Sequence, residues 1–140
     1  MTIKSEVTTT WAGAMAFEAS VNGHTVRMDA AESDGGADSG ARPKPLLLAA
    51  LSGCSGMDVV SILKKMREPC SWFSMRAEAD SGEEHPKKYT SIKLVYQFKA
   101  SDGLNPDNVR KACALSQEKY CGVSAMLKDT APLVWEIEYL

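Results

Sequence analysis

Apolar residues alternate with small or polar ones through the first stretch of the chain, residues 7–17. Alternation with a period of two predicts a β-strand. The pair Asn22-Gly23 follows, and this dipeptide is the strongest short signal for a tight hairpin turn. We therefore expect residues 24–29 to form the returning strand of a hairpin.

A long apolar segment, Leu46 to Arg67, forms the centre of the chain. It follows a small, acidic, glycine-rich segment (residues 30–42) that is typical of a solvated loop. Proline precedes the apolar segment, at a position that a first helical turn tolerates, and Glu68-Pro69 ends it. Spacings of three and four predict a long helix with one continuous stripe. The stripe consists of Leu47, Ala50, Leu51, Cys54, Asp58, Ser61, Ile62 and Lys65.

Three more strands and a second helix are predicted in the remainder of the chain. The strands cover residues 72–79, 89–99 and 133–139, each with apolar residues on alternate positions. Asn105-Pro106 places a capping residue before a proline and so starts the second helix. The inner face of that helix would hold Val109, Ala112, Cys113, Ser116 and Tyr120.

The resulting order, β-β-α-β-β-α-β, predicts an α+β fold in which a strongly curved antiparallel sheet covers a long central helix. No linker or internal repeat divides the chain, so we expect a single domain over residues 1–140. The strand residues Trp11, Met15 and Phe17 and the apolar face of the last strand offer more apolar surface than two helices could cover. This excess predicts a homodimer.

The net charge and the lengths of the apolar runs exclude several classes of protein. A formal net charge of −2 does not suit a nucleic-acid-binding protein, which normally carries a basic excess. The N-terminus has no apolar stretch typical of a secretory signal, and no apolar run is long enough to suggest a membrane protein. We therefore expect a cytoplasmic protein, whose four cysteines stay reduced and serve catalysis, metal binding or packing.

Two of the cysteines have a local context that favours chemistry. Cys54 has Gly53 and Gly56 close by in an otherwise strong helix, and each glycine costs about 1 kcal/mol of helix stability relative to alanine. Cys121 precedes Gly122 where the second helix is expected to end, which would give a thiol able to move. The same residues also fit buried, inert cysteines, and that second interpretation is preferred for Cys70 and Cys113.

Other kinds of site are not supported. There is no C-x-x-C pair, and neither His24 nor His85 lies at normal ligand spacing from a cysteine, so no zinc site is expected. The same lack of a well-placed histidine weakens a papain-like cysteine hydrolase. Nucleotide, dinucleotide and serine-hydrolase motifs are missing, and no bound cofactor is expected.

The sequence of the central helix, PLLLAALSGCSGMDVV over residues 45–60, resembles the signature of the OsmC/Ohr family. These are the osmotically inducible protein C and organic hydroperoxide resistance proteins. Residues 11–17, 85–94 and 120–124 (YCGVS) resemble the same family in the same order, so the resemblance extends over nearly the whole chain.

The resemblance implies an intertwined homodimer and a cysteine-based peroxidase that acts on organic hydroperoxides. In that family the residue corresponding to Cys54 is peroxidatic and the one corresponding to Cys121 is resolving. An external dithiol, of the lipoyl type, would reduce the resulting disulfide. The resemblance places this chain in the OsmC-like branch.

Activation of Cys54 requires a thiolate, because the thiol itself is a poor nucleophile. Arg27, Arg42 and Lys44 are the candidate cations, and Arg42 is preferred because it immediately precedes the helix. Asp58 would oppose a thiolate if it were unpaired, so we expect it to bind an arginine or a backbone group.

Two alternatives to the peroxidase remain. The segment before the helix lacks the glutamate that better-studied family members carry, which favours a stress-associated or small-ligand-binding protein without turnover. The other alternative is a structural dimer whose cysteines only pack the core.

Overall fold

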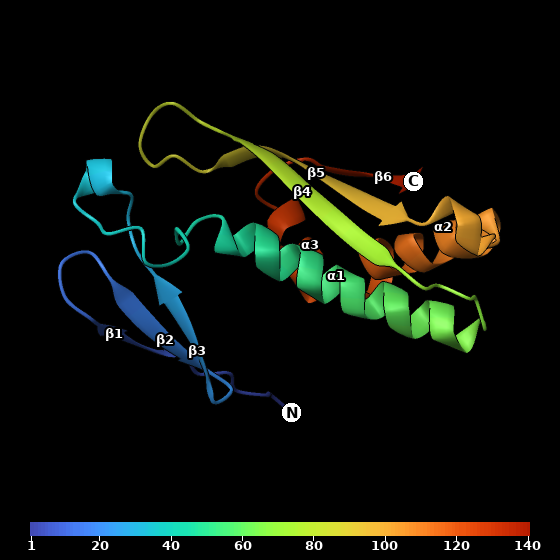
Figure 1. The fold of residues 1–140 in the computed structure, drawn as a ribbon, viewed down its shortest axis with the longest axis horizontal. Coiled ribbons are helices and arrows are strands. Elements are labelled where there is room, and N and C mark those ends of the chain that lie inside the picture. The colour runs from blue at the N-terminus through green and yellow to red at the C-terminus, as the bar shows by residue number, and fades with distance from the viewer. The chain divides into compact units, whose positions relative to one another are not determined.

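The computed structural model describes residues 1–140, which form two compact units, Met1–Leu47 and Leu48–Leu140. Figure 1 shows the fold of each unit. The N-terminal unit holds a three-stranded antiparallel sheet of β1 (Thr8–Trp11), β2 (Phe17–Val21) and β3 (His24–Met28), followed by the short 3-10 turn η1 (Glu32–Asp34). The prediction of a single domain stays a prediction.

The hairpin between β2 and β3 is confirmed. Val21 pairs with His24, and both Asn22 and Gly23 have positive φ, at 50° and 82°. This is the backbone that a two-residue hairpin turn requires.

The prediction of one continuous strand over residues 7–17 is wrong. A turn with positive φ at Gly13 and Ala14 separates β1 from β2, and the Ala12 N–H donates to the Ala16 carbonyl at 2.8 Å. The alternating pattern extends through this turn, so the pattern alone could not reveal the break.

The C-terminal unit is built on a second three-stranded sheet. Its strands are β4 (Phe73–Ser81), β5 (Tyr89–Phe98) and β6 (Leu133–Tyr139), with β5 in the middle. The expectation of an antiparallel sheet is wrong for β6, which runs parallel to β5. Helical segments carry the chain from the end of β5 back to its beginning, so that Leu133 pairs with Ile92, and a parallel pair needs such a crossover.

Helix α1 (Leu46–Lys65) is the long central helix that the sequence predicts (Figure 1). Its buried residues are Leu51, Ser55, Val59 and Leu63, which recur every four positions. The predicted stripe shares only Leu51 with this set, and the register therefore differs from the expected one. The difference buries Ser55 and leaves Cys54 half-buried at the margin of the core.

Three helical segments connect β5 to β6: α2 (Pro106–Leu115), a single π-helical turn η3 (Ser116–Tyr120) and α3 (Gly122–Lys128). A short 3-10 turn, η2 (Ala100–Asp102), precedes them. Asn105 caps α2 through its side chain, as predicted, by accepting from the N–H groups of Asp107 and Asn108. Val109, Ala112, Cys113 and Ser116 are buried as expected, whereas Tyr120 is exposed because the π-turn rotates it outward.

The core of this unit lies between α1, the sheet and the helices of the crossover. The four residues predicted to face inward on β5, namely Ile92, Leu94, Tyr96 and Phe98, are all buried. Phe73 stacks on Phe98 with ring centroids 4.7 Å apart, which joins β4 to β5 across this layer. The packed layer gives α1 and the crossover helices a fixed support.

Candidate functional site

Cys54 lies in the third turn of α1. It is half-buried and packs against the edge of the hydrophobic core. Its neighbour Gly53 faces open space, since a Cβ added there would meet no atom within 4 Å. Gly56 is tighter, since a Cβ there would lie 3.1 Å from the sulfur of Met75, so of the two glycines only Gly53 borders open space.

Cys121 lies between the π-turn and α3, and it is only 3% exposed. Its backbone N–H donates to the Ser116 carbonyl at 2.8 Å, and its sulfur caps α3 by accepting from the Ser124 N–H at 3.4 Å. The expectation of a mobile thiol at a helix end is therefore wrong. Gly122 begins a third helix that the sequence pattern did not predict, and both neighbouring elements hold Cys121 in place.

The fold brings the two predicted thiols together. The Cys121 thiol and the backbone N–H of Val123 are among the neighbouring groups that act on the Cys54 thiol. Cys54 and Cys121 are free thiols, since no disulfide is formed. Two free thiols that lie near each other are the starting point for a disulfide, so this arrangement supports reversible dithiol chemistry.

The electrostatic environment keeps Cys54 protonated. Burial raises the pKa of its thiol, the hydrogen bond with Cys121 raises it further, and the charge of Asp58 acts in the same direction. Only the Val123 N–H opposes these influences, and no lysine or arginine is among the groups that shift this pKa.

Asp58 has a different partner from the one predicted. Its carboxylate accepts from the Ser116 hydroxyl at 3.0 Å instead of binding an arginine or a backbone group. Ser116 belongs to a buried polar cluster behind the cysteines that also holds Ser55, Tyr96 and Gln117. The sequence signal for this cluster was limited to Ser116 on the predicted inner face of the second helix, because Ser55 lay outside the predicted stripe of the central helix.

Arg42 lies in the N-terminal unit, after the loop that follows β3. Its guanidinium donates to the Asp38 carboxylate at 2.7 Å and to the Gly40 carbonyl at 3.1 Å. Arg27 is engaged too, by Glu18 at 2.7 Å. Each arginine is therefore held by a carboxylate of its own unit.

The remaining cysteines fit packing roles. Cys113 is fully buried, and burial raises the pKa of its thiol to about 12, so it stays protonated at any physiological pH. The pKa of Cys70 is also raised by burial. No group of three His, Cys, Asp or Glu side chains is placed to hold a metal ion.

Of the hollows lined by residues of α1, two lie near the turn that carries Cys54 or follow it along the helix. A groove of about 700 Å³ is lined by Gly53, Gly56, Met57 and Val60 together with Phe73 and Met75 of β4. A smaller hollow of about 330 Å³ is lined by Asp58, Ser61, Ile62, Lys65, Leu115 and Tyr120. Asp58, Ile62 and Lys65 follow Cys54 at helical spacings, so the smaller hollow lies along the side of α1 that carries Cys54.

Two comparisons with known proteins find relatives of this chain along most of its length. The family model described as OsmC-like protein matches residues 35–136. Protein YhfA of Escherichia coli strain K12 is 34% identical over 119 residues, which are 85% of each chain.

Solved structures agree on the fold. A hypothetical protein from Aquifex aeolicus VF5 superposes with a TM-score of 0.82 at 27% identity and covers 99% of both chains. The organic hydroperoxide resistance protein OhrB of Bacillus subtilis superposes with a TM-score of 0.67 at 15% identity, over 96% of this chain and 98% of its own. The second likeness concerns the fold alone.

Proposed function

We propose that this chain, which belongs to the family of OsmC-like proteins, is a thiol-dependent peroxidase that reduces organic hydroperoxides. Cys54 is the peroxidatic residue and Cys121 the resolving residue. The observation that carries the proposal is that the fold brings these two thiols, from segments far apart in the sequence, near enough to act on each other. Relatives of the same fold named organic hydroperoxide resistance proteins support the choice of substrate class.

The proposed reaction proceeds in three balanced steps. The Cys54 thiolate attacks the distal peroxide oxygen, so a sulfur–oxygen bond forms, the oxygen–oxygen bond breaks, and the released alkoxide takes a proton to become an alcohol. The sulfur, oxidised by two electrons, is now a sulfenic acid. Attack by Cys121 forms the disulfide and releases water. An external dithiol of the lipoyl type then returns two electrons and becomes a disulfide itself.

The first step needs a thiolate, and burial opposes its formation. Arg42, in the segment that leads into α1, is the proposed activating cation. The hollow that lines the Cys54 side of α1 suits the organic part of a hydroperoxide, because Ile62 and Leu115 offer apolar walls and Tyr120 an aromatic one.

The proposed setting is a homodimer in the cytoplasm, where external dithiols keep the resting cysteines reduced. Support for the dimer comes from apolar side chains that each unit leaves exposed. They include Trp11, Met15 and Phe17 of the N-terminal unit and Met57, Val60 and Val134 of the C-terminal unit. By length and composition alone α1 could cross a membrane, a test that the core helix of a soluble protein also passes.

The test is consumption of cumene hydroperoxide with dihydrolipoamide as the reductant, followed in the wild type and in single cysteine variants. Cys54→Ser should abolish consumption. Cys121→Ser should allow one turnover and then leave Cys54 as the sulfinic acid, because nothing captures the sulfenic acid. Cys70→Ser is the matched control and should consume peroxide like the wild type. A wild-type protein that consumes no hydroperoxide would overturn the proposal.

A second candidate is a small-ligand-binding protein without turnover. The raised pKa of Cys54 favours it, because a protonated thiol is a weak nucleophile. Under this alternative the wild type and Cys54→Ser would show the same lack of peroxide consumption.

A further inference from the structure

A buried polar cluster lies directly behind the two cysteines, and the proposed chemistry does not use it. Its members are Ser55 of α1, Tyr96 of β5, and Ser116 and Gln117 of the π-turn, and all four are at most 4% exposed. Asp58 of α1 closes the cluster at its rim. Burying four polar side chains is costly unless they are hydrogen-bonded, and each of the four takes part in a hydrogen bond of this cluster, although the Oε1 atom of Gln117 is buried without a partner.

The hydrogen bonds of this cluster run in one direction. The Ser116 hydroxyl donates to the Asp58 carboxylate at 3.0 Å, and an ionised carboxylate can only accept. Ser116 therefore accepts from Ser55 at 2.7 Å, and Ser55 in turn accepts from the Tyr96 hydroxyl at 2.6 Å.

The chain of donors begins at Gln117, whose Nε2 donates to the Tyr96 hydroxyl at 2.8 Å. The same Nε2 also lies 3.2 Å from the Ser55 hydroxyl. Aligned donors of this kind polarise one another, which strengthens the chain as a unit. Burial raises the pKa of Tyr96 to about 12, so its hydroxyl keeps the proton that it donates.

Each of the two serines that form the Ser55–Ser116 bond is connected to one of the two cysteines. Ser55 is the residue after Cys54 on α1. The carbonyl of Ser116 accepts the Cys121 N–H, and the ammonium of Lys128 donates to the carbonyl of the next residue, Gln117. One hydroxyl pair therefore ties the helix turn of Cys54 to the π-turn that positions Cys121.

From this geometry we infer that Ser55 and Ser116 are positioning residues, which hold Cys54 and Cys121 at the separation needed to form and break their disulfide. Tyr96, Gln117 and Asp58 fix the direction of the hydrogen bonds that join them. The inference deepens the proposed function, on which it rests for its biological purpose. The disulfide equilibrium itself does not depend on peroxide.

The test is the exchange equilibrium with dithiothreitol. Oxidised dithiothreitol takes two electrons and two protons from Cys54 and Cys121, which form their disulfide as dithiothreitol becomes a dithiol. The equilibrium constant measures how well the fold presents the two thiols to each other. It is determined by acid quenching and peptide mapping in Cys70→Ser protein, which removes a half-buried thiol that could compete.

Ser116→Ala should lower this equilibrium constant about five- to tenfold, the effect of losing one or two buried hydrogen bonds. Ser55→Ala should do the same, and the double variant should lower the constant by less than the product of the two single effects, since both substitutions break the Ser55–Ser116 bond. Tyr96→Phe keeps the ring and loses one donor, so it should lower the equilibrium constant by less than the serine variants do. It also provides a test if Ser116→Ala does not fold. Ser52→Ala is the matched control, because its hydroxyl bonds only to the Leu48 carbonyl of its own helix.

The outcomes separate the two proposals. Equal equilibrium constants in the wild type, Ser55→Ala and Ser116→Ala, or lower melting temperatures with unchanged constants, would overturn the positioning role and leave the peroxidase untouched. A wild type that forms no disulfide with oxidised dithiothreitol would also overturn it. A disulfide that depends on both serines in a protein that consumes no hydroperoxide would uphold the positioning role and overturn the peroxidase.

Discussion

Cys54 and Ser55 are neighbours on one helix, yet the fold uses them differently. A rotation of 100° between successive residues takes Ser55 into the core and leaves Cys54 at its margin, next to Cys121. The glycines beside each cysteine marked both thiols in the sequence. No sequence feature indicated the Ser55–Ser116 contact, because it joins residues 61 positions apart and depends on a π-turn that helix periodicity cannot predict.

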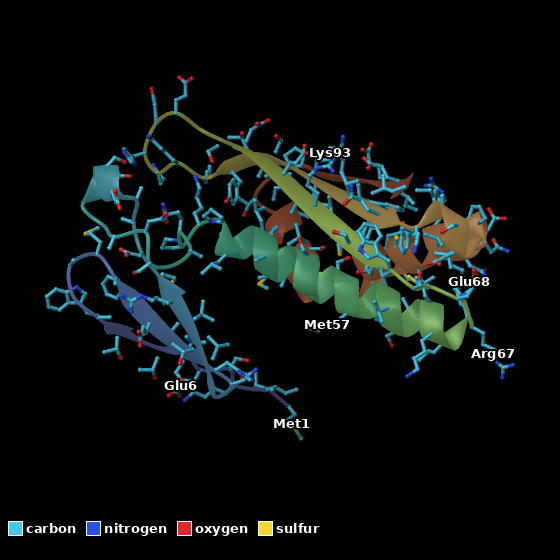
Figure 2. The ribbon with its side chains drawn as sticks, in the orientation of Figure 1. Met1, Glu6, Met57, Arg67, Glu68 and Lys93 are labelled. Carbon is cyan, nitrogen blue, oxygen red and sulfur yellow. The ribbon has the colours of Figure 1, made fainter.

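At this scale the first prediction concerns Arg42. If its charge activates Cys54, Arg42→Gln should move the midpoint of Cys54 alkylation by iodoacetamide to higher pH, because loss of a cation disfavours the thiolate. A shift of one pH unit would lower the rate near pH 7 about tenfold. The control is Arg67→Gln, which removes an exposed charge past the end of α1 (Figure 2). An alkylation profile identical to that of the wild type would remove Arg42 from the site.

The loop after β3 is organised around a buried carboxylate that its composition did not reveal. Its composition predicted a solvated segment, but the structure wraps it around the buried carboxylate of Asp29. That carboxylate accepts from the Ser39 hydroxyl at 2.6 Å and from the N–H groups of Ala37 and Ser39. Gly36 allows the close approach, since a Cβ there would lie 2.1 Å from the Ala30 carbonyl oxygen. Nothing in the spacing of the sequence identified Asp29 as the centre of the loop.

Asp29→Asn should therefore loosen this loop. The amide keeps the size of the side chain but removes the charge and one accepting oxygen, so the N–H groups of Ala37 and Ser39 should exchange with solvent about tenfold faster. Exchange measured by mass spectrometry should show the change in residues 30–41. The same substitution at the exposed Asp34 should have no effect, and equal exchange in both variants would contradict the role of Asp29.

Acid should weaken the same loop in the wild type. The hydrogen bonds from Ser39, Ala30 and Ala37 hold the pKa of Asp29 well below its usual range. The folded loop therefore binds its proton at lower pH than the unfolded loop does. The contribution of Asp29 to stability is full above the ordinary carboxyl pKa of 3.8 and is lost as the pH falls below it.

On the scale of the whole molecule, the fold class followed from the order and type of the elements. The direction of β6 did not, because both a hairpin and a crossover end in an alternating strand with one exposed face. Residues 116–128 decide between the two possibilities by adding a π-turn and a third helix, which return the chain to the start of β5. A single sequence gives little signal for either short element.

Exposed apolar residues on α1 make the oligomeric state testable. We predict that the wild type sediments as a dimer of about twice its 15.2 kDa chain mass. Met57 is 76% exposed on α1 (Figure 2), so Met57→Lys should keep the fold of the chain but place a charge within the predicted interface. Analytical ultracentrifugation should then show monomers. A monomeric wild type at micromolar concentration would contradict the dimer.

Stability at high pH should reflect the buried thiol of Cys113. Burial raises its pKa to about 12, whereas the unfolded chain loses the proton near the ordinary value of 9.0. The unfolded chain therefore binds fewer protons above pH 9, and the free energy of unfolding should fall there by about 1.4 kcal/mol per pH unit for this group. Urea unfolding of reduced protein between pH 8 and pH 11 measures the slope. Cys113→Ala should be less stable at pH 8 but show a shallower decline, and equal slopes would contradict the assignment.

The contact between Cys54 and Cys121 is the central claim, and oxidation by one equivalent of cumene hydroperoxide tests it most directly. The products are mapped as peptides without reduction. We predict that one disulfide forms, that it joins Cys54 to Cys121, and that dihydrolipoamide reverses it. Cys70 and Cys113 should remain free thiols. A protein in which Cys54 is oxidised to the sulfinic acid without that linkage, or in which no cysteine reacts, would contradict the account.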